Sequence, residues 1–231
     1  MAIAIIPARG GSKRIPRKNI RPFCGQPMLA YAIQAAQQSG CFSKVVVSTD
    51  DEEIAGVARQ LGAEVPFLRP ANLADDHTGT TPVVIDTIQR LDQLDIQAEH
   101  YCCIYATVPL IQADDLKGAY QRLIASQAPF VYTVAEFGFP IQRAVRMDEQ
   151  GRVAPFWPEQ MAKRSQDLEI AYQDAGQFYW GTRAAWLGGI SPVGGEGIGH
   201  ILPRHRVVDI DTPEDWHLAE LLYQVLAQDG V

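Results

Sequence analysis

Short apolar runs rich in β-branched residues alternate along the chain with stretches in which apolar residues recur at helical spacing. Buried strands are predicted at residues 2–6, 45–47, 101–105 and 130–135, with a further extended piece at 64–68. Helices are predicted at residues 27–38, 51–61, 81–94 and 114–126. Strands that alternate with helices in this way indicate a mostly parallel α/β sheet with right-handed crossovers.

The periodic pattern disappears between about residues 138 and 174, where prolines, charges and Trp157 follow one another without a clear period. We interpret this stretch as an excursion from the sheet that serves as a dimerisation arm or a lid. Strands are expected to return at 177–180 and 206–210, and a last helix is expected to begin with Thr212 as its N-cap. The prediction is one domain, 1–231, with an insertion at about 138–174.

The charge of the chain is unevenly distributed. Its 20 Lys and Arg against 27 Asp and Glu give a net charge of −7, which argues against a general nucleic-acid binder. Between Met1 and Lys44, however, there are seven basic residues and no acidic one. The four cysteines lack CxxC spacing and the chain has no apolar run of 18 residues, so we expect a cytoplasmic protein with no membrane partner.

Most of the basic residues lie in one loop after the first predicted strand. It reads Pro-Ala-Arg-Gly-Gly-Ser-Lys-Arg-Ile-Pro-Arg-Lys-Asn from Pro7 to Asn19, and it matches neither a Walker A loop nor a GxGxxG loop. Glycines let a backbone approach an anion closely, while Arg and Lys add full charges. Because ligands of parallel sheets bind at the carboxyl ends of the strands, the loop predicts a polyphosphate site.

An acidic pair late in the chain is the candidate partner for a metal ion. In an extended segment, Asp209 and Asp211 would point to one side while Ile210 faces the core, and Mg²⁺ on a triphosphate needs one or two such carboxylates. An ordinary polar strand end, or a cap for the next helix, would account for the same residues. Asp50, at the end of another strand, is either a second candidate or a helix cap.

These segments resemble a known family. The run Ile6-Pro7-Ala8-Arg9-Gly10-Gly11-Ser12-Lys13 is similar to the signature loop of the CMP-sialic acid synthetases, which are cytidylyltransferases for acidic sugars. Residues 47–50, 68–71 and 209–212 continue the resemblance in order, and residues 103–107, 139–143, 164–168 and 174–180 are most similar to the pseudaminic acid cytidylyltransferase branch. The resemblance implies a Rossmann-like nucleotidyltransferase sheet.

The resemblance also implies a reaction, in which CTP and pseudaminic acid give CMP-pseudaminic acid and pyrophosphate. Arg9, Lys18 and Asp211 would be catalytic, and Asp211 with Asp209 would hold Mg²⁺. The residues expected to bind the nucleotide are Ala8, Arg9, Gly10, Gly11, Ser12, Lys13, Lys18, Asn19 and Arg69. Those expected to bind the sugar are Tyr105, Gln142, Arg143, Arg164, Gln166, Asp174, Gln177 and Tyr179.

Other functions remain open from the sequence. The acceptor of a cytidylyltransferase could also be N-acetylneuraminate, legionaminate or 3-deoxy-manno-octulosonate. A protein that binds nucleotide without catalysis would not need Arg9, Lys18 and both aspartates, and a glycosyltransferase with an Asp-x-Asp site would have little use for a triphosphate loop. We also expect a homodimer, because Phe156, Trp157 and Met161 in the insertion look exposed.

Overall fold

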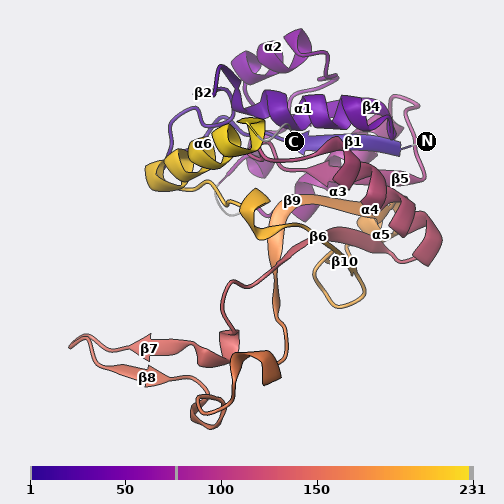
Figure 1. Cartoon of the computed structure of the whole chain (residues 1–231). Helices are drawn as coiled ribbons and strands as arrows, with labels where there is room; N and C mark the ends of the chain where they lie inside the picture. Colours follow the sequence, from indigo (N-terminus) through magenta and orange to yellow (C-terminus); the bar gives the residue numbers. More distant parts are fainter. Residues whose placement is uncertain (1, 76–77, 229–231) are drawn as a thin grey trace.

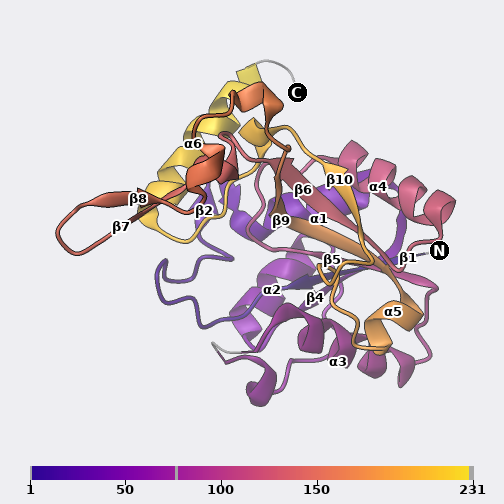
Figure 2. The same ribbon diagram turned by 90° about the horizontal axis from the view of Figure 1, so that it is seen from below.

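The computed structural model describes residues 2–75 and 78–228, and its centre is a six-stranded sheet in the order β10–β6–β9–β5–β1–β4 (Figure 1, Figure 2). The strands are β1 (Ala2–Pro7), β4 (Phe42–Ser48), β5 (His100–Ile104), β6 (Phe130–Glu136), β9 (Tyr172–Thr182) and β10 (Ile198–Ile201). β1 pairs in parallel with β4 and β5, and β10 with β6, whereas β9 is antiparallel to both of its neighbours. The predicted mostly parallel α/β sheet is confirmed.

Helices cover both faces of this sheet. On one face lie α1 (Met28–Ser39), α2 (Glu52–Gln60) and α4 (Ala113–Ser126); on the other lie α3 (Thr80–Asp92) and α5 (Arg183–Leu187). Successive strand residues serve the two cores in turn, so Cys102 packs with α4 and Cys103 with α3. No helix among the described residues has the length and apolar character needed to cross a bilayer.

The last helix, α6 (Pro213–Gln228), packs against the opening segment of the chain. Its Trp216 and the preceding Ile210 are buried with Phe23, which lies in the small β2 (Pro22–Phe23) and β3 (Gln26–Pro27) ribbon. Thr212 caps the helix, because its hydroxyl accepts a hydrogen bond from the Asp215 amide at 3.2 Å. This packing brings the basic loop and the acidic pair to the same end of the molecule.

One expected strand is absent, and the expected extended piece at 64–68 makes only one bridge to the sheet. Residues 206–210 do not join the sheet, because Val208 and Ile210 pack under α6 instead; the place beside β6 is taken by β10. A short 3₁₀ turn, η5 (Arg204–Arg206), connects β10 to this segment. The bridge from the piece at 64–68 joins Val46 and Glu64.

The insertion forms an arm that projects from the body of the protein (Figure 1). It contains the antiparallel hairpin of β7 (Val145–Met147) and β8 (Val153–Pro155). Three 3₁₀ turns accompany the hairpin, η2 (Ile141–Arg143), η3 (Pro158–Gln160) and η4 (Ser165–Asp167). Large apolar side chains are exposed along the arm: Phe139, Val145, Met147, Val153, Phe156, Trp157, Met161, Ile170 and Tyr172. The arm therefore presents an apolar surface that its own chain does not cover.

One carboxylate both caps α2 and anchors the basic loop. Asp51 accepts hydrogen bonds from the amides of Glu53 and Ile54 at 2.9 and 3.0 Å, and it receives two hydrogen bonds from the Arg17 guanidinium. The hydrogen bond from Arg17 is the main cause that lowers the pKa of Asp51 to about 2. The ionised form is therefore the one that the folded protein favours.

This depressed pKa predicts an acid-dependent contribution to stability. The contribution is present above the ordinary carboxyl pKa and is lost as the pH falls toward about 2, because the unfolded chain takes up the proton first. We expect Asp51→Asn to lower the urea midpoint at pH 6, and the gap from the wild type to close as the pH falls below about 4. The exposed Asp95→Asn is the control, and a gap that stays constant down to pH about 3 would contradict the assignment.

Candidate active site

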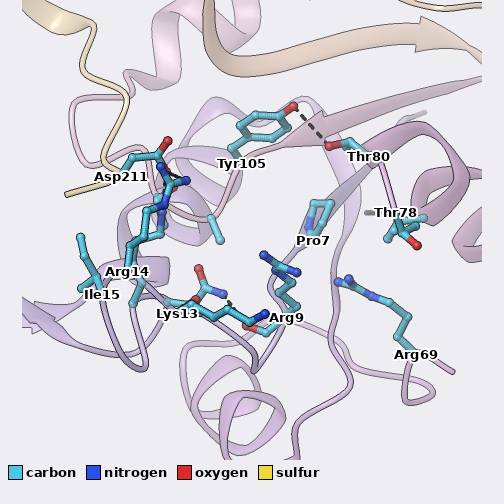
Figure 3. A pocket seen from close by; sticks show the side chains of 17 residues that line it. Pro7, Arg9, Lys13, Arg14, Ile15, Arg69, Thr78, Thr80, Tyr105 and Asp211 are labelled. Atoms are coloured by element: carbon cyan, nitrogen blue, oxygen red, sulfur yellow. Dashed lines mark hydrogen bonds and ion pairs between the residues drawn. The ribbon is translucent and has the colours of Figure 1, made fainter. Parts of the chain in front are cut away.

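A pocket of about 270 Å³ lies at the carboxyl ends of β1 and β5 (Figure 3). The basic loop after β1 forms one wall, the start of α3 forms another, and Asp211 closes the side toward α6. It is lined by Pro7, Arg9, Ser12, Lys13, Arg14, Ile15, Lys18, Asn19, Arg69, Thr78, Gly79, Thr80, Val83, Tyr105, Ala106, Thr107 and Asp211. The location is the one at which open α/β sheets bind their ligands.

The charge of the pocket is strongly positive. Five basic side chains face it, and Asp211 is the one acidic residue among the described lining residues. Figure 3 shows Arg9, Lys13 and Arg69 grouped on one side and Arg14 beside Asp211 on the other. Such a cluster in a concave site favours a ligand with several negative charges, and a triphosphate has them.

Lys18 links the loop to the acidic segment. Its ammonium donates a hydrogen bond of 2.5 Å to the Ile210 carbonyl and lies 3.5 Å from Asp211 Oδ1. Arg14 contacts the same carboxylate oxygen at 2.7 Å. Lys18 and Ile210, which are 192 residues apart in the sequence, thus meet at one pocket.

The acidic pair has the chemistry that a hard divalent cation requires. Ile210 is buried, and desolvation followed by the charge of Asp211 raises the pKa of Asp209. Asp211 lines the pocket, whereas Asp209 is exposed and is not among the lining residues. The described residues contain no cluster of three side chains that could hold a metal on their own. Two carboxylates with phosphate oxygens are a donor set that suits Mg²⁺, so the residues fit this ion.

Arg69 and Asn19 are fixed by buried hydrogen bonds. Arg69 is 6% exposed and donates to the hydroxyl and the carbonyl oxygen of Ser48, while burial lowers its pKa. The Asn19 side-chain amide donates to the Arg9 carbonyl at 2.9 Å, and so it orders the loop from within. Both side chains are held in place before any ligand arrives, as a specific binding site requires.

Three small residues of the loop that were expected to bind the nucleotide, Ala8, Gly10 and Gly11, are not among the residues that line the pocket. Ala8 is buried and its amide donates to Ser48 O at 2.9 Å. The Gly10 amide donates to Asp50 Oδ1 at 3.0 Å, so Asp50 anchors the loop, and the cap of α2 is Asp51 instead. Gly11 is exposed, with open space where a Cβ would be. Ser12, in contrast, lines the pocket.

Two of the six basic residues from Arg9 to Arg21 make contacts outside the pocket that the sequence did not reveal. Arg17 pairs with Asp51 and Glu53, and Arg21 lies over the Trp216 ring at 4.9 Å. These two arginines therefore do not line the ligand space. Arg9, Lys13 and Lys18 are the basic residues of the loop that face the pocket together with Arg14.

A second pocket of about 190 Å³ adjoins the first and shares Thr80 and Tyr105 with it. The Tyr105 hydroxyl lies 3.2 Å from Thr80 Oγ1, and the Tyr179 hydroxyl donates to Asp174 at 2.6 Å. Burial raises the pKa of both tyrosines, which keeps their hydroxyl groups neutral and able to donate. A polar ligand bound beside the triphosphate would contact the hydroxyl groups of these two tyrosines.

The other expected sugar ligands lie elsewhere in this chain. Four belong to the arm, where Gln142 donates to Glu169 O, Arg143 to Lys163 O, and Arg164 pairs with Asp167, while Gln166 lies in η4. Gln177 is buried, and its amide donates to Arg206 O at 2.6 Å. None of these five residues lines either of the two pockets.

Sequence reasoning missed part of both pockets. Thr78, Gly79 and Thr80 precede or begin α3, and their Thr/Gly-rich run was the available signal. In the second pocket the missed residues are Thr81, Trp186, Ser191, Pro192 and Val193. The last three come from the glycine-rich segment before β10, whose sequence has no motif that marks it as part of a site.

Comparison with known proteins identifies the family of the chain. The cytidylyltransferase family model matches residues 3–176. The chain is 47% identical to a pseudaminic acid cytidylyltransferase of Campylobacter jejuni serotype O:2 and 34% identical to a CMP-N,N'-diacetyllegionaminic acid synthase of Legionella pneumophila, each over 96% of both proteins. A solved CMP-2-keto-3-deoxy-manno-octonic acid synthetase with CTP has the same fold, with a TM-score of 0.71, 18% identity and 99% coverage of both chains. The chain belongs to the cytidylyltransferase family.

Proposed function

We propose that this enzyme transfers a cytidylyl group from CTP to pseudaminic acid, and so forms CMP-pseudaminic acid and pyrophosphate. The observation that carries the proposal is the meeting of Lys18 with Ile210 O and Asp211 in a pocket that four other cations line. The identity of 47% over 96% of the chain to a relative named pseudaminic acid cytidylyltransferase supports this acceptor.

In this reaction the anomeric hydroxyl oxygen of the sugar bonds to the α-phosphorus of CTP. The bond from that phosphorus to the pyrophosphate oxygen breaks, pyrophosphate leaves, and the hydroxyl proton passes to solvent water. Arg9, Ser12 and Lys13 hold the triphosphate, while Lys18 stabilises the charge that develops on the α-phosphate and the leaving group. Arg69 and Asn19, which internal hydrogen bonds hold in place, keep the nucleotide in register.

Asp209 and Asp211 are the residues that would hold Mg²⁺ in this proposal. The ion, when bound, would neutralise phosphate charge and act as a Lewis acid at the phosphoryl oxygens. Asp211 pairs with Arg14 and Lys18, and so holds both cations in the pocket. Because its carboxylate itself lines the pocket, it would also orient the attacking hydroxyl.

The acceptor sugar would occupy the second pocket. Tyr105, Asp174 and Tyr179 offer hydroxyl and carboxylate groups there, next to the place where the α-phosphate would lie. The arm residues Gln142, Arg143, Arg164 and Gln166 do not line this pocket in their own chain, so we propose that they contribute to the site of a second copy. Their role therefore depends on the proposed homodimer. We propose the cytoplasm as the compartment, since its reducing conditions suit four unpaired cysteines.

The acceptor is tested by mass spectrometry of the products formed from CTP, Mg²⁺ and a panel of nine-carbon acids. We expect CMP-pseudaminic acid to form fastest, with legionaminic acid and N-acetylneuraminic acid slower, and 3-deoxy-manno-octulosonic acid included as an eight-carbon control. Faster turnover of legionaminic acid would assign the enzyme to the other acceptor. Pyrophosphate release without any sugar adduct would contradict cytidylyl transfer altogether.

Lys18→Ala tests the role of the loop cation. We expect the variant to fold, because the packing of Ile210 and Trp216 against Phe23 still holds the two segments together, and to lose about a hundredfold or more in kcat. Pyrophosphate release and thermal unfolding are measured on the same samples. Lys44→Ala removes a lysine that pairs with Glu64 outside the site and is the matched control, with native kcat. A native turnover for Lys18→Ala would overturn the assignment.

The arm predicts a homodimer that a variant can break. Met147 and Val153 are directly paired across the hairpin and are 71% and 65% exposed, so they lie on one apolar face. We expect the wild type to sediment as a dimer at micromolar concentration and the double variant Met147→Glu and Val153→Glu to sediment as a monomer. Ile124→Glu on α4 controls for added surface charge. A monomeric wild type would contradict the dimer.

A further inference from the structure

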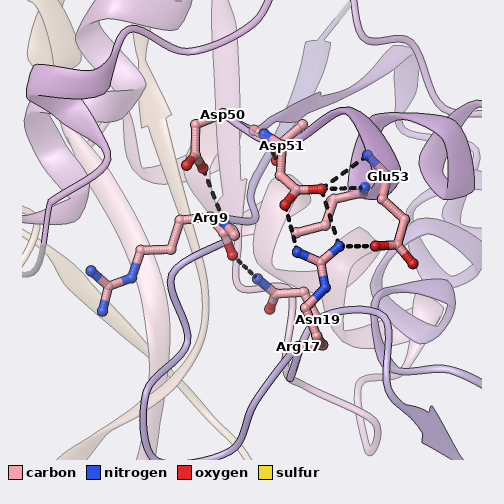
Figure 4. A network of polar contacts seen from close by, with 9 residues as sticks. Arg9, Arg17, Asn19, Asp50, Asp51 and Glu53 are labelled. Carbon is pink, nitrogen blue, oxygen red and sulfur yellow. Dashed lines mark hydrogen bonds and ion pairs between the residues drawn. The ribbon is translucent and has the colours of Figure 1, made fainter.

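Two adjacent residues of the basic loop send their side chains in opposite directions. Lys18 reaches the pocket and Ile210 O, whereas Arg17 reaches the start of α2 and is not among the pocket residues. Figure 4 shows the Arg17 guanidinium between Asp51 and Glu53, while the Arg9 side chain extends away from that network. The direction of the chain at Arg17 therefore decides which way Lys18 points.

The backbone at Arg17 is in a conformation that its side chain does not favour. Its φ is +58°, in the left-handed region that residues other than glycine seldom adopt. The Arg17 carbonyl closes the turn by accepting hydrogen bonds from the amides of Ile20 and Arg21 at 3.0 and 2.9 Å. Such a turn persists only where the surroundings hold it, and here the guanidinium is the group that is held.

Arg17 attaches the loop to α2 through two parallel hydrogen bonds from its guanidinium to the Asp51 carboxylate, which we call the fork. Arg17 Nη1 donates to Asp51 Oδ2 at 2.5 Å and Nη2 donates to Asp51 Oδ1 at 3.1 Å, with a further contact from Nη2 to Glu53. Asp51 is itself held by the amides of α2, so the fork ties the loop to a helix that packs on the sheet. A bidentate arginine fixes both distance and orientation, which a lysine cannot do.

The Asp51 carboxylate also contacts the part of the loop around Gly10. A Cβ at Gly10 would lie 2.8 Å from Asp51 Oδ2, so the Gly10 backbone rests directly against Asp51. The Gly10 amide is bound by Asp50 at 3.0 Å. The loop therefore contacts Asp50 and Asp51, after the end of β4, at two places: at Gly10, next to Arg9, and at Arg17, next to Lys18.

We propose that Arg17 is a positioning residue for the cytidylyltransferase reaction, which holds the loop through Asp51 so that Lys18 and Arg9 face the triphosphate before CTP arrives. The inference rests on the proposed function for the identity of the nucleotide. Arg17 does not touch the substrate. Its removal lowers the fraction of protein whose loop is ready to bind, and the apparent affinity for CTP falls by that fraction.

The test is isothermal titration of the full chain with CTP and Mg²⁺, without any sugar. Arg17→Gly removes the guanidinium and tolerates the left-handed φ, so it separates loss of the fork from backbone strain. We expect about tenfold weaker CTP binding for Arg17→Gly, a partial rescue in Arg17→Lys, and a melting temperature lowered no more than in Asp51→Asn, because both variants lose the same ion pair. Arg59→Gln, which removes an exposed arginine near Glu52 on α2, is the matched control and should bind CTP normally.

A double-mutant cycle distinguishes positioning from direct contact. If Arg17 acts through Asp51, then Arg17→Gly combined with Asp51→Asn binds CTP no more weakly than the weaker single variant, since asparagine keeps the helix cap. If the two losses multiply, Arg17 contacts the ligand itself and the inference is overturned.

Two further results would overturn it. Wild-type affinity in Arg17→Gly would mean that the fork does not position the loop. A wild-type chain that fails to bind CTP would contradict the proposed function and the inference together, whereas the first result leaves the proposed function intact. If Arg17→Gly does not fold, Arg17→Lys and Asp51→Asn carry the same comparison. With pseudaminic acid added, we expect Arg17→Gly to raise KM for CTP more than it lowers kcat.

Discussion

The contact of Lys18 with the Ile210 carbonyl is the interaction on which the site depends, because it joins the two ends of the chain. The basic loop follows β1 and the acidic segment precedes α6, so neither can form a triphosphate site alone. Burial of Trp216 and Ile210 against Phe23 supplies the apolar force that brings these segments together. The Lys18 ammonium then fixes the position of one segment relative to the other by donating a hydrogen bond to the Ile210 carbonyl.

The basic residues from Arg9 to Arg21 have two different roles, which depend on what each side chain contacts. Arg17 and Arg21 serve the fold, through two carboxylates and an indole ring, while Arg9, Lys13, Arg14 and Lys18 surround the ligand space. Their sequence spacing alone does not distinguish these roles. Because the structural arginines are neutralised or stacked outside the pocket, the loop keeps a definite shape although like charges repel within it.

Much of the fold and part of the site could be predicted, where a local pattern carried the information. The strands and helices around the basic loop have clear periodicity, and Arg9, Lys18 and Asp211 stand out by charge. β10 could not be predicted, because Ile-Gly-His-Ile becomes a strand only beside β6, whereas the better strand pattern at 206–210 is used to pack under α6. Thr78 to Thr80 and the partners of Arg17 likewise depend on tertiary neighbours, which no local spacing reveals.

The five basic residues of the first pocket have a consequence for the release of pyrophosphate. Charges arranged to attract a triphosphate attract free pyrophosphate as well, since both present closely spaced phosphate oxygens to the same guanidinium and ammonium groups. The leaving group must therefore escape from the site that stabilised it, and it competes there with the next nucleotide. In the proposed reaction pyrophosphate would therefore inhibit as a product, and rising ionic strength would weaken the binding of pyrophosphate and CTP alike, because counterions screen the same cations.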